Sequence, residues 1–176
     1  VIMDYPGYGK SKGKLSEALL HEVVEVTFRK MTKDLGEDKL IIIAGRSLGT
    51  ALASNLAFKV NPHKLILISP YYNMPDLFRH HGKLFSFKNL KFRFENNVYL
   101  AKVQCDTYIF HGDMDKLIPL KLSKKLIAYL KDHQNFIEIA GADHMNVHET
   151  HLYKDTLKKI LSYVNQIQFV KIISKN

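Results

Sequence analysis

The chain has 176 residues, of which 46% are hydrophobic, a single cysteine and a formal net charge of +9. The length suits one domain, the hydrophobic fraction is too high for a disordered chain, and one cysteine excludes an internal disulfide. The positive charge favours acidic partners or an anionic membrane surface, although no apolar run approaches the roughly 20 residues of a membrane-spanning helix.

The first predicted elements are a strand, a turn and an amphipathic helix. Residues 1–4 predict the strand, which leads into the turn at residues 6–9. Apolar side chains then recur at helical spacing over residues 15–35, with Ser16 as the expected N-cap and Gly36 as the expected C-cap.

A glycine-flanked serine follows the next predicted strand. The strand is the apolar run 40–44, the sequence Gly-Arg-Ser-Leu-Gly occupies residues 45–49, and a small-residue helix is expected over 48–59. So tight a strand-to-helix turn holds its central residue in a strained conformation and needs small neighbours. It would lift the Ser47 hydroxyl to the position of a nucleophile and point the Leu48 N–H at a developing oxyanion. The alternative is an ordinary turn with a helix-capping serine.

The stretch 71–104 interrupts the alternation of strands and helices. Residues 64–69 predict a buried strand that ends at Pro70. The stretch that follows is long for a connection in a compact domain, and it mixes aromatic with basic residues. Its aromatic side chains fit a helical connector that fills the core beneath it. They would also suit a nucleic-acid surface, but the chain carries no nucleic-acid-binding motif.

Two further strand–helix pairs complete the predicted layout. The strands are expected at residues 107–111 and 136–140, and the helices at 120–131 and from about 150 to 167. Repeated alternation of this kind predicts an α/β fold, with a mostly parallel sheet, right-handed crossovers and flanking helices.

Acidic residues and a histidine follow these last two strands. Asp113 and Asp115 come after the first strand, and Asp143 and His144 after the second. Since a serine nucleophile needs a base and the base needs a carboxylate, the order Ser47, Asp, His at three strand ends indicates nucleophilic catalysis. Asp113 is an alternative acid or a turn residue, and Asp143 is interpreted as a loop-shaping residue because adjacent side chains point apart.

The other histidines and the cysteine have simpler interpretations. His111 is expected to pack at a strand end, and the pair at 80–81 to be exposed. His148 and His151 have a spacing that can suit a metal, but without a nearby carboxylate pattern a solvated helix face is favoured. Cys105 is expected to be a small buried filler. We therefore predict no metal and no cofactor.

Four motifs together resemble the α/β-hydrolase superfamily, in particular its serine aminopeptidase-like and depalmitoylase-like small hydrolases. They are residues 4–11, 45–50, 111–115 and 141–144. The resemblance implies Ser47 as the nucleophile, His144 as the base and Asp115, the last residue of a His-Gly-x-x-Asp motif, as the acid. Order and placement at strand ends support these roles independently.

The resemblance also has consequences for the fold. Residues 1–4 would be the fourth strand of the family's sheet, so its first three strands and a helix are expected to be missing. We therefore expect one N-terminally incomplete domain over residues 1–176, from a fragment or truncated gene product. It would have an open strand position in the sheet and lack the loop that supplies the second oxyanion donor. In this family, segments such as 71–104 form a cap over the pocket.

The predicted function is a serine hydrolase that cleaves an ester, thioester or amide through a Ser47-His144-Asp115 triad and an acyl-enzyme. The expected substrate is a small or acylated molecule. A non-catalytic module of the same fold, an inactive fragment, and acyl transfer to an acceptor other than water remain alternatives. Nucleic acid is not expected, peripheral membrane contact and oligomeric state stay open, and a cytoplasmic location is favoured although targeting signals are left undetermined.

Overall fold

The computed structural model describes residues 16–33, 39–82, 91–162 and 167–173. Within them, five parallel strands form one sheet in the order β4-β3-β2-β1-β5. The strands are β1 (Leu40–Arg46), β2 (Lys64–Ile68), β3 (Asp106–Gly112), β4 (Phe136–Ile139) and β5 (Ile167–Ile173). The helices are α1 (Glu17–Thr32), α2 (Gly49–Val60), α3 (Met74–His80), α4 (Asn96–Leu100), α5 (Leu120–Lys124) and α6 (His151–Ser162), with 3-10 turns at Lys125–Tyr129, His133–Asn135 and Val147–Glu149.

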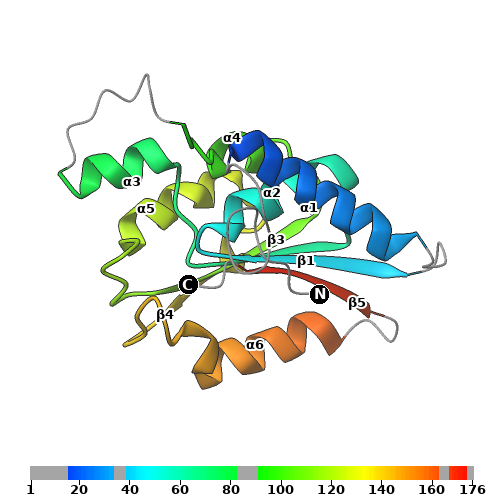
Figure 1. The fold of residues 1–176 in the computed structure, drawn as a ribbon. Coiled ribbons are helices and arrows are strands. Elements are labelled where there is room, and N and C mark those ends of the chain that lie inside the picture. Colours follow the sequence, from blue (N-terminus) through cyan, green and yellow to red (C-terminus); the bar gives the residue numbers. More distant parts are fainter. Residues whose placement is uncertain (1–15, 34–38, 83–90, 163–166, 174–176) are drawn as a thin grey trace.

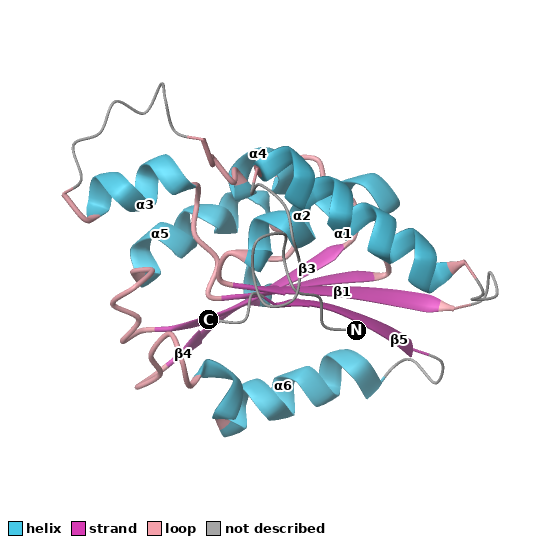
Figure 2. Cartoon of the chain, in the orientation of Figure 1, coloured by secondary structure: helices cyan, strands magenta, loops and turns pink. Residues whose placement is uncertain are grey.

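Helices cover both faces of this sheet. Helices α1 to α5 lie on one side and α6 lies on the other (Figure 1), and the sheet is the middle layer (Figure 2). None of the helices in the described residues is both long and apolar enough to cross a membrane.

Apolar side chains fill the space on each side of the sheet. In β1, Ile43 packs with Leu52 of α2 in one buried cluster, whereas Ile42 belongs to a second cluster with Phe110 and Tyr153. The rings of Phe110 and Tyr153 meet edge to face, with centroids 4.8 Å apart. Strands buried on both faces have nearly continuous apolar sequences, which is why the runs at these positions predicted a parallel sheet. The α/β prediction is confirmed.

Several predicted element ends can be compared with the structure. Ser16 caps α1, since its hydroxyl accepts a hydrogen bond from the Leu19 N–H at 3.2 Å. Gly36 and the strand predicted at residues 1–4 lie outside the described residues. The helix predicted over 120–131 is instead α5 followed by a 3-10 turn.

The C-terminal part of the chain differs most from the prediction. The helix expected from 150 to 167 ends earlier, as α6, and strand β5 follows it. This strand pairs with the whole of β1, from Leu40 opposite Ile167 to Arg46 opposite Ile173. The expectation of an open position beside β1 is therefore wrong, because β5 occupies it. A short apolar run after a helix fits a strand as well as a further helical turn, so the pattern alone misled.

The described part of the stretch 71–104 packs partly into the core. Asn96, at the start of α4, is fully buried, donates to the Thr50 hydroxyl at 3.0 Å and accepts from the Ser54 hydroxyl at 3.0 Å. Phe94 lies in the core cluster that includes α1 and α2. These contacts fit the connector interpretation, and a role as a cap stays a prediction.

Candidate active site

Strand β1 and helix α2 meet in a tight turn at Ser47. This residue has a φ of 51°, in the left-handed region that residues with a side chain rarely adopt. The Ser47 N–H donates to the Ile68 carbonyl at 2.9 Å, and the Thr50 N–H donates to the Ser47 carbonyl at 3.0 Å. A Cβ on Gly45 would lie 2.6 Å from the Gly49 carbonyl oxygen, so glycine is required for α2 to pack this closely. The geometry matches the strained turn expected from the sequence.

The loops that carry Asp115 and His144 leave two neighbouring strands, β3 and β4. Gly112 ends β3 directly against the backbone of Ala142, where any Cβ would overlap the Ala142 carbonyl. The Met114 N–H donates to the same carbonyl at 2.9 Å. The two loops are thus fastened to each other, which fixes the relative position of the carboxylate and the imidazole.

A continuous chain of hydrogen bonds joins the three residues singled out by the sequence. His144 Nε2 lies 3.0 Å from Ser47 Oγ, and His144 Nδ1 lies 2.8 Å from Asp115 Oδ2. The other carboxylate oxygen, Oδ1, accepts the N–H groups of Leu117 at 3.0 Å and Ile118 at 2.8 Å. Because a carboxylate only accepts, Nδ1 carries the proton, and Nε2 is left to accept from the serine hydroxyl.

Buried surroundings shape the charges of this site. Burial alone would raise the pKa of Asp115, but hydrogen bonds from His144 and the Ile118 N–H outweigh it and leave that pKa below its ordinary value. The site therefore holds an ionised carboxylate within hydrogen-bond distance of the His144 imidazole. His111, a second histidine, lies 3.4 Å from Asp115 Oδ2 and 2.8 Å from the Ile118 carbonyl. Burial lowers its pKa despite those two partners.

His111 is the neighbour whose part in the site the sequence did not reveal. It is fully buried at the end of β3, as expected for a packed strand-end residue. A spacing of four residues brings side chains together on a helix, but these two residues lie at a strand end and in the turn after it, so nothing in the sequence signalled the contact.

Leu48 stands where an oxyanion donor would be needed. It directly precedes α2 and has helical backbone angles. The N–H groups at the start of a helix have no acceptor within that helix, so they can bind a developing negative charge. Ser47 and the start of α2 share one turn, which keeps this donor next to the hydroxyl.

The remaining acidic candidates lie outside the hydrogen-bonded chain. Asp113 Oδ1 accepts the Gly141 N–H at 2.7 Å and so ties the two loops together. Asp143 Oδ1 accepts the N–H groups of Met145 at 2.7 Å and Asn146 at 3.0 Å, which confirms it as a loop-shaping residue. The structure thus joins Asp115, and not Asp113, to the imidazole.

The four other histidines that the sequence analysis considered lie on the surface. The pair at 80–81 is exposed, and so are His148 and His151. Within the described parts of the chain, no three histidine, cysteine or acidic side chains gather as metal ligands would.

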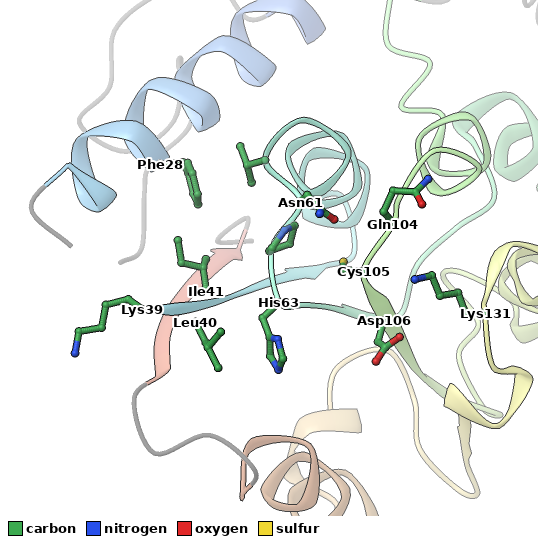
Figure 3. Close-up of a pocket in the computed structure, with 12 residues that line it drawn as sticks. Phe28, Lys39, Leu40, Ile41, Asn61, His63, Gln104, Cys105, Asp106 and Lys131 are labelled. Atoms are coloured by element: carbon green, nitrogen blue, oxygen red, sulfur yellow. The ribbon is translucent and has the colours of Figure 1, made fainter. Parts of the chain in front are cut away.

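Two cavities lie at opposite ends of the sheet. One of about 460 Å³ touches His144 and is lined by Met114, Lys116, Leu117, Gly141, Asp143, His144 and Met145. A larger one of about 520 Å³ lies where the strands begin, with Leu40, His63, Asp106 and Cys105 among its lining residues (Figure 3). Burial raises the pKa of the Cys105 thiol to about 11, so that thiol is a poor nucleophile. We place the candidate chemistry at the smaller cavity, because it adjoins the hydrogen-bonded chain.

Comparison with known proteins finds relatives described as alpha/beta hydrolases or lipases. The chain is 28% identical over 165 residues to human alpha/beta hydrolase domain-containing protein 17B, covering 93% of this chain and 55% of that protein. It is 28% identical over 145 residues to lysophosphatidylserine lipase ABHD12 of Danio rerio, covering 72% and 38%.

The fold also matches a solved alpha-beta serine hydrolase homologue from Coxiella burnetii, with a TM-score of 0.63 and 20% identity, covering 90% of this chain and 65% of that one. No profile of a known protein family matches, and the chain spans about half the length of the curated relatives it matches. With the strand order, the turn at Ser47 and these relatives, the chain belongs to the α/β-hydrolase superfamily.

Proposed function

We propose that the protein is a serine hydrolase that cleaves an ester, thioester or amide through an acyl-enzyme. The observation that supports this most is the hydrogen-bonded chain from Ser47 Oγ through His144 to Asp115, with links of 3.0 and 2.8 Å. Three side chains from separate parts of the sequence meet there in the relation that activates a serine hydroxyl.

Each residue then has a defined step. Ser47 Oγ attacks the carbonyl carbon while His144 Nε2 takes its proton, and Asp115 stabilises the imidazolium that forms. The Leu48 N–H binds the oxyanion, and one such donor is typically worth about 3–4 kcal/mol in the transition state. His144 returns the proton to the leaving group, which departs and leaves the acyl group on Ser47. Water, deprotonated by the same imidazole, attacks the acyl-enzyme and releases the acid.

The surroundings of His144 favour an acylated substrate. Met114, Leu117 and Met145 are exposed and line the cavity beside the imidazole, so they offer apolar contact to a hydrocarbon group. Lys116 in the same lining would suit an anionic headgroup. The lipase name of the Danio rerio relative agrees with such a substrate, and the net charge of +9 is compatible with work near an anionic surface.

A fluorophosphonate probe tests the proposed nucleophile. We expect the folded chain to gain one adduct, mapped to Ser47 by peptide mass spectrometry. Ser47→Ala should abolish the adduct and His144→Ala should slow it strongly, whereas the matched control Ser162→Ala, at an exposed serine of α6, should label as the unaltered chain does. A folded chain that takes no probe would instead favour a non-catalytic module of this fold.

A further inference from the structure

Arg46 connects the strand that leads to Ser47 with the loop that carries His144. It is the last residue of β1, and its Nη2 donates to the backbone carbonyl of His144 at 2.8 Å. The same nitrogen lies 3.7 Å from the sulfur of Met145. Arg46 and His144 are 98 positions apart in the sequence, so only the folded chain brings them together.

The alternation of side chains along β1 explains why Arg46 reaches this loop. Ile42 and Ala44 lie in the cluster on the α6 side of the sheet, and a residue two positions further along a strand shares that face. The loop with His144 runs directly into α6, on the same side (Figure 1). The guanidinium stays charged at all ordinary pH values, and a charged donor makes a stronger hydrogen bond than a neutral one.

We propose that Arg46 is a positioning residue for acyl transfer, a role that rests on the proposed serine hydrolase function. Proton transfer requires Nε2 to stay within about 2.6–3.2 Å of the serine oxygen. The bonds to Asp115 and Ser47 orient the ring of His144, but the ring starts from a main chain that lies in a loop. Arg46 ties that main chain to the residue adjacent to Ser47. The hydrogen bond from Arg46 to the His144 carbonyl thereby fixes the distance between the imidazole and the serine hydroxyl directly. Without it, that distance would depend on the packing of the sheet and of two loops.

Substitutions at Arg46 can distinguish the hydrogen bond from Nη2 from a mere requirement for positive charge at this position. The Arg46 Nε is buried without a hydrogen-bond partner, which is unfavourable for stability, so the guanidinium is held by its Nη2 end. A lysine would keep the charge and a donor without the buried Nε–H, although its ammonium lacks the planar geometry. Arg46→Lys should therefore retain part of the function, and Arg46→Met, which keeps an apolar stem but no donor, should lose it.

Kinetics on the full chain test the proposal. With p-nitrophenyl butyrate as the probe substrate, Arg46→Met should lower kcat about 10- to 100-fold, the loss expected for a misplacement near 1 Å, with KM nearly unchanged. Arg46→Lys should recover much of this loss. The matched control is Arg29→Met, at an exposed arginine of α1 that pairs with Glu25, and it should behave as the unaltered chain. A wild-type kcat in folded Arg46→Met would overturn the proposal.

A second readout needs no turnover. The proton on His144 Nδ1, held against Asp115, should give a resolved downfield resonance by NMR. In Arg46→Met that resonance should broaden through faster exchange with solvent, while Arg29→Met should leave it sharp. If fluorophosphonate does not label the unaltered folded chain, the serine hydrolase proposal fails. The NMR resonance would still test whether Arg46 positions His144. A resonance that stays equally sharp in Arg46→Met refutes the positioning role.

Discussion

Replacing Asp115 by asparagine should reverse the proton arrangement of the candidate active site. Oδ1 of Asp115 accepts two backbone N–H groups, from Leu117 and Ile118. In Asp115→Asn these donors require the amide oxygen at that position, because an NH₂ group there would face two other donors. The NH₂ group must then face His144 Nδ1, which has to accept. The imidazole proton moves to Nε2, the atom that should receive the serine proton.

The size of the effect follows from this change of tautomer. A triad held in the wrong tautomer loses about 10⁴-fold in kcat, which corresponds to about 5 kcal/mol in the activation barrier. The expected result is a slowing of that order in fluorophosphonate labelling and in ester hydrolysis, with the fold retained by circular dichroism. His111, 3.4 Å from Oδ2, would also face the new NH₂ group, so a modest loss of stability should accompany the loss of rate.

Asp113→Asn is the matched control, since Asp113 lies two positions away and accepts a single N–H, that of Gly141. It should label at close to the normal rate. Normal labelling of Asp115→Asn would refute the assignment of the acid, and slow labelling of Asp113→Asn alone would show that the alternative acid is the correct one.

Two further predictions concern the pKa values outside the triad. Burial raises the pKa of the Cys105 thiol to about 11, so this thiol should resist iodoacetamide at pH 8 in the folded chain and react once urea unfolds the chain. Mass spectrometry of the intact chain would measure the alkylation. Rapid alkylation of the folded chain would contradict the prediction. Burial alone would raise the pKa of Glu17. Hydrogen bonds from His21 and from the N–H groups of Arg93 and Phe94 outweigh this effect, so the pKa of Glu17 lies below its ordinary value of 4.5. The contribution of the Glu17 carboxylate to stability should be complete above pH 4.5 and disappear as the pH falls through the lowered pKa. Glu17→Gln should therefore be less stable to urea than the unaltered chain at pH 7 and equally stable in acid. An equal difference in stability at both pH values would refute this prediction.

Much of the sheet and the candidate site could be predicted because the relevant signals are local. Apolar runs mark the strands that are buried on both faces, and Ser47, Asp115 and His144 each follow such a run in the order that this fold uses. The ends of parallel strands meet at one edge, so placement at strand ends predicted that these residues lie near one another. The choice of Asp115 over Asp113 came from the family resemblance.

The parts that could not be predicted depend on contacts distant in the sequence. Strand β5 becomes a strand by pairing with β1, and its short apolar pattern does not distinguish it from the end of a helix. Asn96 is a polar residue in the core because Thr50 and Ser54 satisfy its amide, and its own segment gives no sign of that. Arg46 could have been noticed as a charged residue that ends an apolar strand, but its acceptor on His144 is visible only in three dimensions.

The turn at Ser47 has one more consequence. The imidazole opposite its hydroxyl comes from a point 97 residues later in the chain. Under the proposed function, Ser47 of a growing polypeptide is therefore an ordinary alcohol, and it becomes reactive only once the loop that carries His144 has folded against the turn. The fraction of molecules labelled by fluorophosphonate at Ser47 would then equal the fraction that has folded. The probe would therefore measure refolding yield as well as reactivity.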